Sequence, residues 1–473
     1  AALADPTNKH TIENLSLTLS NSLQLKLHKD LTFDASYNIN NYRRLYKDRT
    51  AANIYSDAVG VTKTTTHYQK DTYRERPYEY TYHNVDAYFT YEHSWNKEHN
   101  FKAVAGMNYE KYRLVDNIVE QFGLGSDQID SFNSVNDDTY WLVQQDISAY
   151  KTLGFFARIN YDYKGKYLFE ASMRADGTSR FAKKDRWGYF PSVSAGWRFT
   201  EERFMEGVRH WWDNGKIRLS YGALGNSNVD PYTYLETFGL STFGTGSGDA
   251  ARYLFGQAKL RYTSLPGQIP DNIGWETSKT FDVGLDAGFL NGRLNLTADY
   301  YVRKTVDMYT VGPTLPDTFG ATAPKGNYAD MSTYGYEISL SYNDSFRLAG
   351  KPFNFGIKTT LADYYSVIDR YNNASRKLSD YYEGQRLGEI WGFVCNGLFQ
   401  NQAEIDAAFG GKGYKNDIMQ TSEKYITYPG DMRFEDLNGN DAIDRGSSTV
   451  DDPGDRKIIG NSEPRYIYTI SLN

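Results

Sequence analysis

The sequence lacks three features that would each point to a common class of protein. Its 473 residues contain one cysteine, Cys395, so no disulfide can form within the chain. No stretch approaches the roughly 18 apolar residues that a membrane-spanning helix needs, which excludes crossing a membrane by helices. The formal net charge is −7, which provides no basic field for a nucleic acid, so we expect no nucleic-acid partner.

Aromatic residues, in contrast, are abundant. The chain has 41 Tyr, 25 Phe and 8 Trp, yet its mean hydropathy is −0.65. A sequence that is both this aromatic and this polar is hard to pack as one soluble core. It suits a membrane barrel whose lumen and loops are wet and whose rims carry aromatic girdles.

Apolar and polar residues alternate along many short segments. One such segment is followed by Asn291-Gly292, a dipeptide that favours a tight hairpin because both residues tolerate positive φ. Its apolar members are Phe281, Val283, Leu285, Ala287 and Phe289, and those after the turn are Leu294, Leu296, Ala298, Tyr300 and Val302. A period of two places all of them on one face of a sheet. The pattern predicts an all-β fold, an antiparallel transmembrane β-barrel with lipid outside and water inside.

The same alternation predicts about thirteen strands. Their approximate spans are 15–28, 30–43, 82–95, 99–113, 152–163, 166–178, 188–199, 214–224, 278–290, 292–306, 331–344, 352–365 and 464–473. Short turns such as Lys164-Gly165 alternate with long connections, and residues 200–213 have room for a helical turn or two. The long connections are 44–81, 114–151, 225–277, 307–330 and 366–463. Long loops on one side only are typical of outer-membrane barrels, whereas a soluble β-sandwich, the alternative, has no reason to segregate them.

Several stretches resemble the SusC/RagA family of TonB-dependent outer-membrane transporters. The segment from Trp275 to Leu294 is similar to the family's most recognisable barrel hairpin. Tyr167 to Phe181, followed by Phe190 to Trp197, resembles another. The motifs Gly397-Leu398-Phe399-Gln400, Pro429-Gly430-Asp431, Asp436-Leu437-Asn438-Gly439 and Ile458-Ile459-Gly460-Asn461 resemble the long loop before the family's late strands. The resemblance covers nearly the whole chain and is specific as a set.

The resemblance implies a fold and a function. Residues 1–473 would be part of one 22-stranded barrel in the bacterial outer membrane, without the plug, the TonB box and the final strands. The protein would import oligosaccharides or peptides, powered through the TonB complex and capped by a SusD-like surface lipoprotein. It would not be an enzyme. The rivals are a siderophore- or cofactor-type TonB-dependent receptor and a surface glycan-binding β protein.

One acidic loop matches part of a calcium-binding pattern. Its oxygen-bearing side chains stand at positions one, three, five and nine, namely Asp436, Asn438, Asn440 and Asp444. Asp441 replaces the usual glycine of position six, and Ser447 stands where a bidentate Glu is expected. Calcium is therefore the one cofactor that the sequence raises, and a solvated Asx-rich turn is the alternative.

Two long loops hold aromatic residues that form a second set of candidates. They are Tyr232, Tyr234, Phe238, Phe243, Tyr253 and Phe255 in the first loop and Trp391 and Phe393 in the second. These rings would stack on sugars, contact a partner protein, or pack among themselves. If the short turns are periplasmic, both loops lie at the cell surface, where we expect them to dock the lipoprotein.

Overall fold

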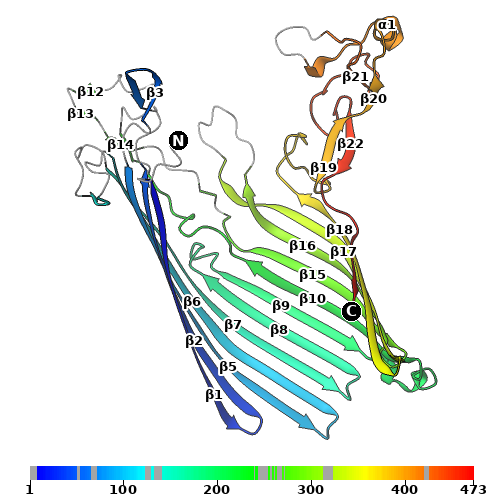
Figure 1. Cartoon of the computed structure of the whole chain (residues 1–473). Coiled ribbons are helices and arrows are strands. Elements are labelled where there is room, and N and C mark those ends of the chain that lie inside the picture. The colour runs from blue at the N-terminus through cyan, green and yellow to red at the C-terminus, as the bar shows by residue number, and fades with distance from the viewer. Residues whose placement is uncertain are drawn as a thin grey trace.

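The computed structural model describes residues 8–50, 54–64, 72–122, 129–132, 141–238, 240–242, 254–255, 258–259, 261–263, 269–270, 272–312, 323–419 and 426–473. Thirteen of the described strands form one antiparallel sheet in chain order (Figure 1). They are β1 (Lys9–His28), β2 (Leu31–Thr50), β5 (Thr72–Trp95), β6 (His99–Phe122), β7 (Trp141–Tyr163), β8 (Tyr167–Thr178), β9 (Trp187–Trp197), β10 (Trp212–Asn226), β15 (Glu276–Phe289), β16 (Leu294–Val311), β17 (Lys325–Leu348), β18 (Lys351–Arg370) and β23 (Ile467–Leu472).

All thirteen predicted strands are confirmed, but several predicted ends are wrong. The strand predicted at 82–95 begins at Thr72, and those predicted at 99–113 and 152–163 extend to Phe122 and back to Trp141. Apolar alternation stops where a strand leaves lipid, because both faces then meet water. The backbone hydrogen-bond ladder between β5, β6 and β7 nevertheless continues past that point. The sequence pattern therefore underestimates the length of each of these strands at the same end, the end next to the long connections.

The short turns gather at one end of the sheet, the lower end in Figure 1. In the predicted hairpin, Asn291 and Gly292 have φ values of 55° and 75°, as a tight turn of this kind requires. The connection after β9 contains two short 3₁₀ turns, η3 (Phe199–Glu201) and η4 (Arg203–Met205), which confirms the helical turns expected there. The strand predicted to reach 199 is wrong by two residues, because Phe199 turns away to contact Trp212.

The long connections contain small elements that the sequence pattern missed. Their paired strands are β3 (Ile54–Ala58) with β4 (Val61–Thr64), β11 (Leu240–Thr242) with β14 (Arg261–Thr263), β12 (Leu254–Phe255) with β13 (Ala258–Lys259), β19 (Glu389–Phe393) with β22 (Arg456–Asn461), and β20 (Cys395–Leu398) with β21 (Met432–Phe434). The last two pairs, α1 (Gln402–Gly411) and the 3₁₀ turn η6 (Asp417–Met419) belong to residues 371–466, which we call the surface arm. It projects beyond the sheet, opposite the short turns (Figure 1).

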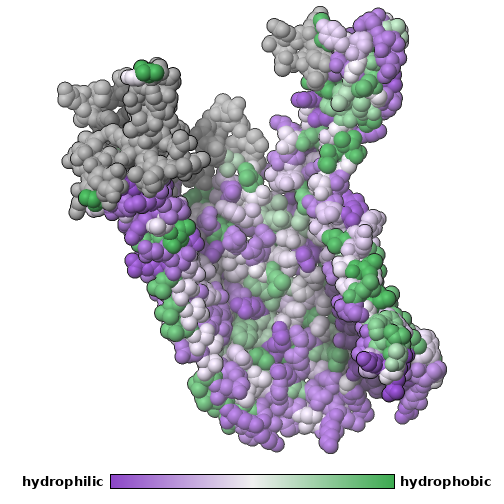
Figure 2. Space-filling model, viewed as in Figure 1, coloured by the Kyte–Doolittle hydropathy of each residue, from purple (hydrophilic) through white to green (hydrophobic). Residues whose placement is uncertain are grey.

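The curved sheet has two chemically different faces. Along β9, the odd-numbered residues from Trp187 to Trp197 are exposed on the convex face, and the even-numbered residues between them lie on the concave face. Aromatic residues therefore stand at both ends of an apolar stretch whose length suits a membrane strand. Figure 2 shows the hollow between the two side walls and hydrophilic residues along the lower rim. Among the described residues, no helix is long and apolar enough to span a membrane.

Candidate functional site

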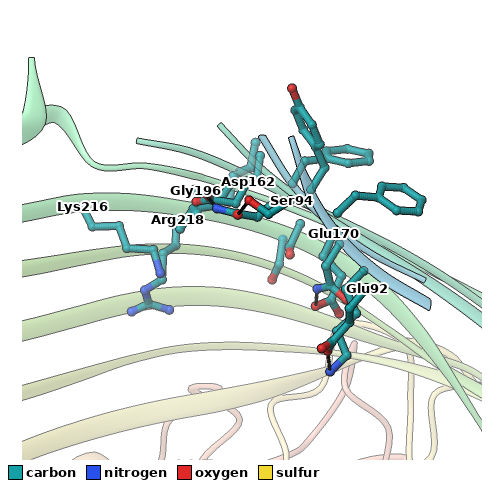
Figure 3. Close-up of a pocket in the computed structure, with 18 of the residues that line it drawn as sticks. Glu92, Ser94, Asp162, Glu170, Gly196, Lys216 and Arg218 are labelled. Atoms are coloured by element: carbon teal, nitrogen blue, oxygen red, sulfur yellow. Dashed lines mark hydrogen bonds and ion pairs between the residues drawn. The ribbon is translucent and has the colours of Figure 1, made fainter. Parts of the chain in front are cut away.

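The concave face carries an open cavity of about 820 Å³ near the short turns (Figure 3). Its wall is polar because inward-pointing positions of neighbouring strands are mostly charged or hydroxyl-bearing. They include Glu92, Lys102, Asp162, Glu170, Ser194, Lys216, Arg218 and Asp282. Charges of both signs are present along this wall, so it has no strong field of either sign. Such a surface suits a neutral polar ligand or a protein segment better than a highly charged solute.

Arg218 links three strands of this wall through ion pairs. Its guanidinium donates to both carboxylate oxygens of Asp286, at 2.9 and 3.2 Å, and to Asp299 at 2.7 Å. The three side chains come from β10, β15 and β16, so the contacts tie three adjacent strands together. A forked guanidinium is suited to such two-point binding of carboxylates. Sequence reasoning did not single out Arg218, because its partners are 68 and 81 residues away.

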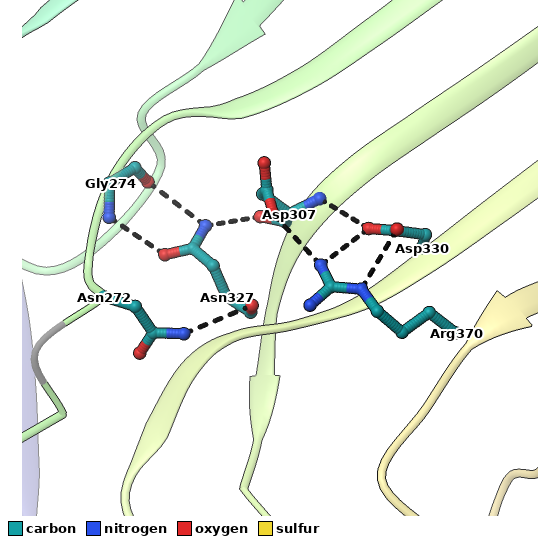
Figure 4. A network of polar contacts seen from close by, with 6 residues as sticks. All are labelled: Asn272, Gly274, Asp307, Asn327, Asp330 and Arg370. Atoms are coloured by element: carbon teal, nitrogen blue, oxygen red, sulfur yellow. Dashed lines mark hydrogen bonds and ion pairs between the residues drawn. The ribbon is translucent and has the colours of Figure 1, made fainter.

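A second polar network fixes the opposite end of these strands (Figure 4). The buried Asn327 amide accepts from the Gly274 N–H at 2.9 Å and donates to the carbonyls of Gly274 and Asp307. Arg370 donates to Asp330 at 2.8 and 3.0 Å and to Asp307 at 2.9 Å. Asp307 has a φ of 56° where the β16–β17 register shifts. The network therefore anchors the bases of three long connections to the sheet.

An apolar cluster beside this network holds the start of the 225–277 connection. Phe181, Val229 and Ile273 are buried together, with Trp275 packed against them. Arg180 adds a hydrogen bond to the Val229 carbonyl at 2.9 Å. The loop base is therefore rigid before the first candidate aromatic residue is reached.

The aromatic candidates of this loop fall into three groups. Tyr232 and Phe238 are exposed and Tyr234 is half-buried. Phe255 lies in β12, and only its backbone is described. Phe243 and Tyr253, together with the glycine-rich loop tip at 244–248, lie outside the described residues.

In the surface arm, the two aromatic candidates pack internally. The Trp391 indole N–H donates to the Tyr382 hydroxyl at 3.2 Å, and that hydroxyl donates to Glu389 at 2.6 Å. Burial, together with the smaller effect of the hydrogen bond to the Glu389 carboxylate, raises the pKa of Tyr382 to about 12. Phe393 packs against Phe434 with ring centroids 5.7 Å apart. Both candidates are half-buried, so they hold the arm together in this structure.

The acidic loop folds around a carboxylate that the sequence pattern had not included. Asp455 is fully buried and accepts from the backbone N–H groups of Leu437 and Asp444, at 2.7 and 2.8 Å. Asp436 accepts from Gly439 at 2.6 Å, and the Asn440 amide donates to Asp444 at 2.6 Å.

These contacts belong to an Asx-rich turn, the alternative to a calcium loop. Asn438, the remaining candidate ligand, accepts from the Asn440 N–H at 3.1 Å. Within the described part of the chain, no group of three His, Cys, Asp or Glu side chains is arranged to hold a metal. The calcium hypothesis stays a prediction.

Comparison with known proteins identifies the family. The sequence profile described as "TonB dependent receptor-like, beta-barrel" matches residues 3–451. The chain belongs to this family. Its members are transporters and receptors of the bacterial outer membrane, which confirms the localisation expected from the sequence.

Individual relatives confirm the SusC/RagA resemblance. TonB-dependent receptor SusC of Bacteroides thetaiotaomicron is 30% identical over 318 residues, which cover 64% of this chain and 29% of SusC. TonB-dependent receptor P39 of Formosa agariphila is 25% identical over 94% of this chain and 42% of its own length. The RagAB peptide transporter shares the fold, with a TM-score of 0.70 and 21% identity over 83% of this chain and 41% of that chain. The chain thus spans less than half the length of these relatives.

Proposed function

We propose that the full-length protein imports oligosaccharides or peptides across the outer membrane, driven through TonB and assisted by a SusD-like surface lipoprotein. The proposal rests on the chemical difference between the two faces of the sheet. Its convex face is apolar with aromatic ends, and its concave face is lined by polar residues that include the Arg218 network. A wall of this kind encloses a water-filled path through lipid. The transporters and receptors of this family support transport, rather than catalysis, as the proposed activity.

The lipoprotein part of the proposal is supported by an apolar patch on the surface arm. Leu398 and Met432 are directly opposed in the β20–β21 pair, and Tyr428 begins the turn that leads into β21. We call these three residues the β20–β21 patch. Their exposed fractions are 48%, 58% and 60%, which is high for large apolar side chains on one small hairpin. Aromatic residues and Met are enriched in protein interfaces, and clustered exposed apolar groups usually mark one.

Co-purification tests the patch directly. The full-length protein carrying Leu398→Ser and Met432→Ser is expressed with the lipoprotein encoded beside it, and the lipoprotein recovered is quantified. We expect a marked loss of the lipoprotein with normal barrel insertion, because arm residues do not face lipid. Leu348→Ser is the matched control, since Leu348 is equally exposed at the short-turn end of β17.

Uptake distinguishes the proposal from its rivals. Cells that depend on the protein should lose growth on the transported oligosaccharide or peptide when the patch is changed, and keep it with Leu348→Ser. Full lipoprotein recovery from the patch variant would show that the patch is not part of the interface. Absence of any co-purifying lipoprotein from the wild type would favour a siderophore-type receptor, which works without a lid.

A further inference from the structure

An exposed basic cluster lies on the convex face, directly beyond the apolar band. Alternation places Lys111, Arg113 and Lys151 on the face opposite the cavity, because Lys102 on β6 and Asp162 on β7 line that cavity from even-numbered positions. The ladders from β5 to β7 show no register shift in this part. All three cations are exposed. We call them the rim cluster.

The register fixes the height of the rim cluster relative to the apolar band. One cross-strand row on the convex face consists of Tyr37, Val85, Tyr109 and Leu153. The next row towards the long loops contains His83, Lys111 and Lys151 side by side, and Arg113 stands in the row after it. Tyr37 hydrogen-bonds His83 at 2.9 Å and marks the aromatic edge of the band. Tyrosine at such an edge is typical of the boundary between hydrocarbon and headgroups.

Lys111 and Lys151 are directly opposed partners, an arrangement that repels. Like charges at opposed positions of an antiparallel pair destabilise the sheet unless something neutralises them. Among the described residues, none of the three cluster cations has a carboxylate within 4.0 Å. The nearby exposed carboxylate on this face is Glu79, and it stands opposite Arg43, another exposed cation. The local excess of positive charge is therefore not balanced within the described chain.

The same arrangement recurs elsewhere on the sheet. Lys279 and Lys304 are directly opposed on the convex face of β15 and β16, and both are exposed. The row immediately below them is apolar and aromatic and contains Phe281, Val302, Tyr334 and Tyr365. Both opposed lysine pairs therefore lie one row above the apolar band. This recurrence indicates that cations are favoured at that height on the convex face, rather than by a contact particular to one site.

We propose that the rim cluster binds the phosphorylated headgroup of a lipid in the extracellular leaflet of the outer membrane. Lys and Arg are the residues that bind phosphate oxygens most strongly, and one phosphate group offers enough oxygens for two opposed lysines and Arg113. The lipid's chains would lie on the apolar rows below, while its headgroup neutralises the cations. A soluble anionic substrate fits less well, because the cluster faces away from the polar concave wall. This inference goes beyond the transport proposal and does not depend on it.

The test measures which lipids the full-length protein retains in detergent. Purified protein is mixed with phosphatidic acid, whose headgroup is a phosphate monoester, or with phosphatidylcholine, and bound lipid is counted by native mass spectrometry. We expect the wild type to retain phosphatidic acid preferentially and Lys111→Gln/Lys151→Gln to retain roughly tenfold less. Lys26→Gln/Lys358→Gln is the matched control, because Lys26 and Lys358 are exposed on the concave face.

The outcomes separate the lipid from other sources of phosphate. Loss of phosphatidic acid from the rim-cluster variant but not from the control supports the proposal, and equal retention by both variants overturns it. Isothermal titration with inorganic phosphate alone is the third arm. Binding of free phosphate that displaces the lipid and is lost in the same variant would assign the cluster to a soluble anion instead. Lys151→Gln alone provides the same comparison if the double variant does not insert.

Discussion

Leu296 of β16 and Leu340 of β17 are directly opposed on the convex face of the sheet. Thr297, the next residue, is opposed to Asp286 and Ser339 on the concave face. Two neighbouring residues of one strand therefore meet different solvents. The register between β15, β16 and β17 makes this contrast testable.

Placing a charge on each side of β16 should have very different costs. We expect Leu296→Arg to destabilise the barrel by about 2–4 kcal/mol where Leu296 lies near the bilayer midplane. Thr297→Arg should cost much less, because its guanidinium enters the polar lumen near the Asp286 carboxylate. Heat-modifiable gel migration of the two folded proteins provides the comparison. Equal impairment by both substitutions would show that the assigned register is wrong.

A close approach between Gly225 and Phe190 predicts a second sensitive position. A Cβ atom at Gly225 would clash with the Phe190 ring, which is buried against Trp275 and cannot move aside freely. We expect Gly225→Ala to destabilise the folded protein by about 1–3 kcal/mol in urea unfolding. Gly222→Ala on the same strand is the control, since its nearest atom is the mobile Ser192 hydroxyl at 3.0 Å. Adding Phe190→Leu to Gly225→Ala should recover part of the loss.

The segment 129–132 should detach from β2 in acid. The Arg49 guanidinium, 2.8 Å from Asp130, holds the pKa of that carboxyl below its usual value. A depressed pKa in the folded state stabilises docking above the ordinary Asp pKa of about 4, and this contribution disappears as pH falls through the folded-state value. Hydrogen exchange of residues 129–132, corrected for intrinsic rates, should therefore rise at acidic pH. Asp130→Asn should abolish this dependence, and an unchanged profile in that variant would contradict the assignment.

Calorimetry decides between the two interpretations of the acidic loop. If calcium binds, titration of the full-length protein with Ca²⁺ should give a saturable heat that Asp436→Ala removes, because Asp436 supplies the first ligand of the pattern. If the loop is an Asx-rich turn built on Asp455, neither protein should bind. In that case Asp455→Ala should loosen the loop more than Asp436→Ala, since Asp455 is fully buried and accepts three backbone hydrogen bonds.

The sequence predicts the strands well because lipid imposes a simple pattern on them. Phe281 to Phe289 alternate in hydropathy since one face meets hydrocarbon, and Asn291-Gly292 allows the turn that follows. Where both faces meet water, hydropathy does not alternate, which is why the sequence pattern predicts the start of β5 ten residues late. The polar networks were missed for a different reason. Arg218 and Asn327 hydrogen-bond to residues that are distant in sequence, so no short residue spacing in the sequence indicates those contacts.

The length of β5 and β6 has a consequence for what can enter the protein. Each has 24 residues, or roughly 80 Å of chain at about 3.3 Å per residue, whereas the apolar band of such a sheet is roughly 25 Å tall. Even with a steep tilt, much of each strand stands clear of the bilayer as a hydrogen-bonded wall. The width of the entrance on this side is therefore fixed by backbone ladders rather than by the loops above it. Bulky solutes would meet a stiff collar outside the bilayer, and only the parts above that collar are left to open and close.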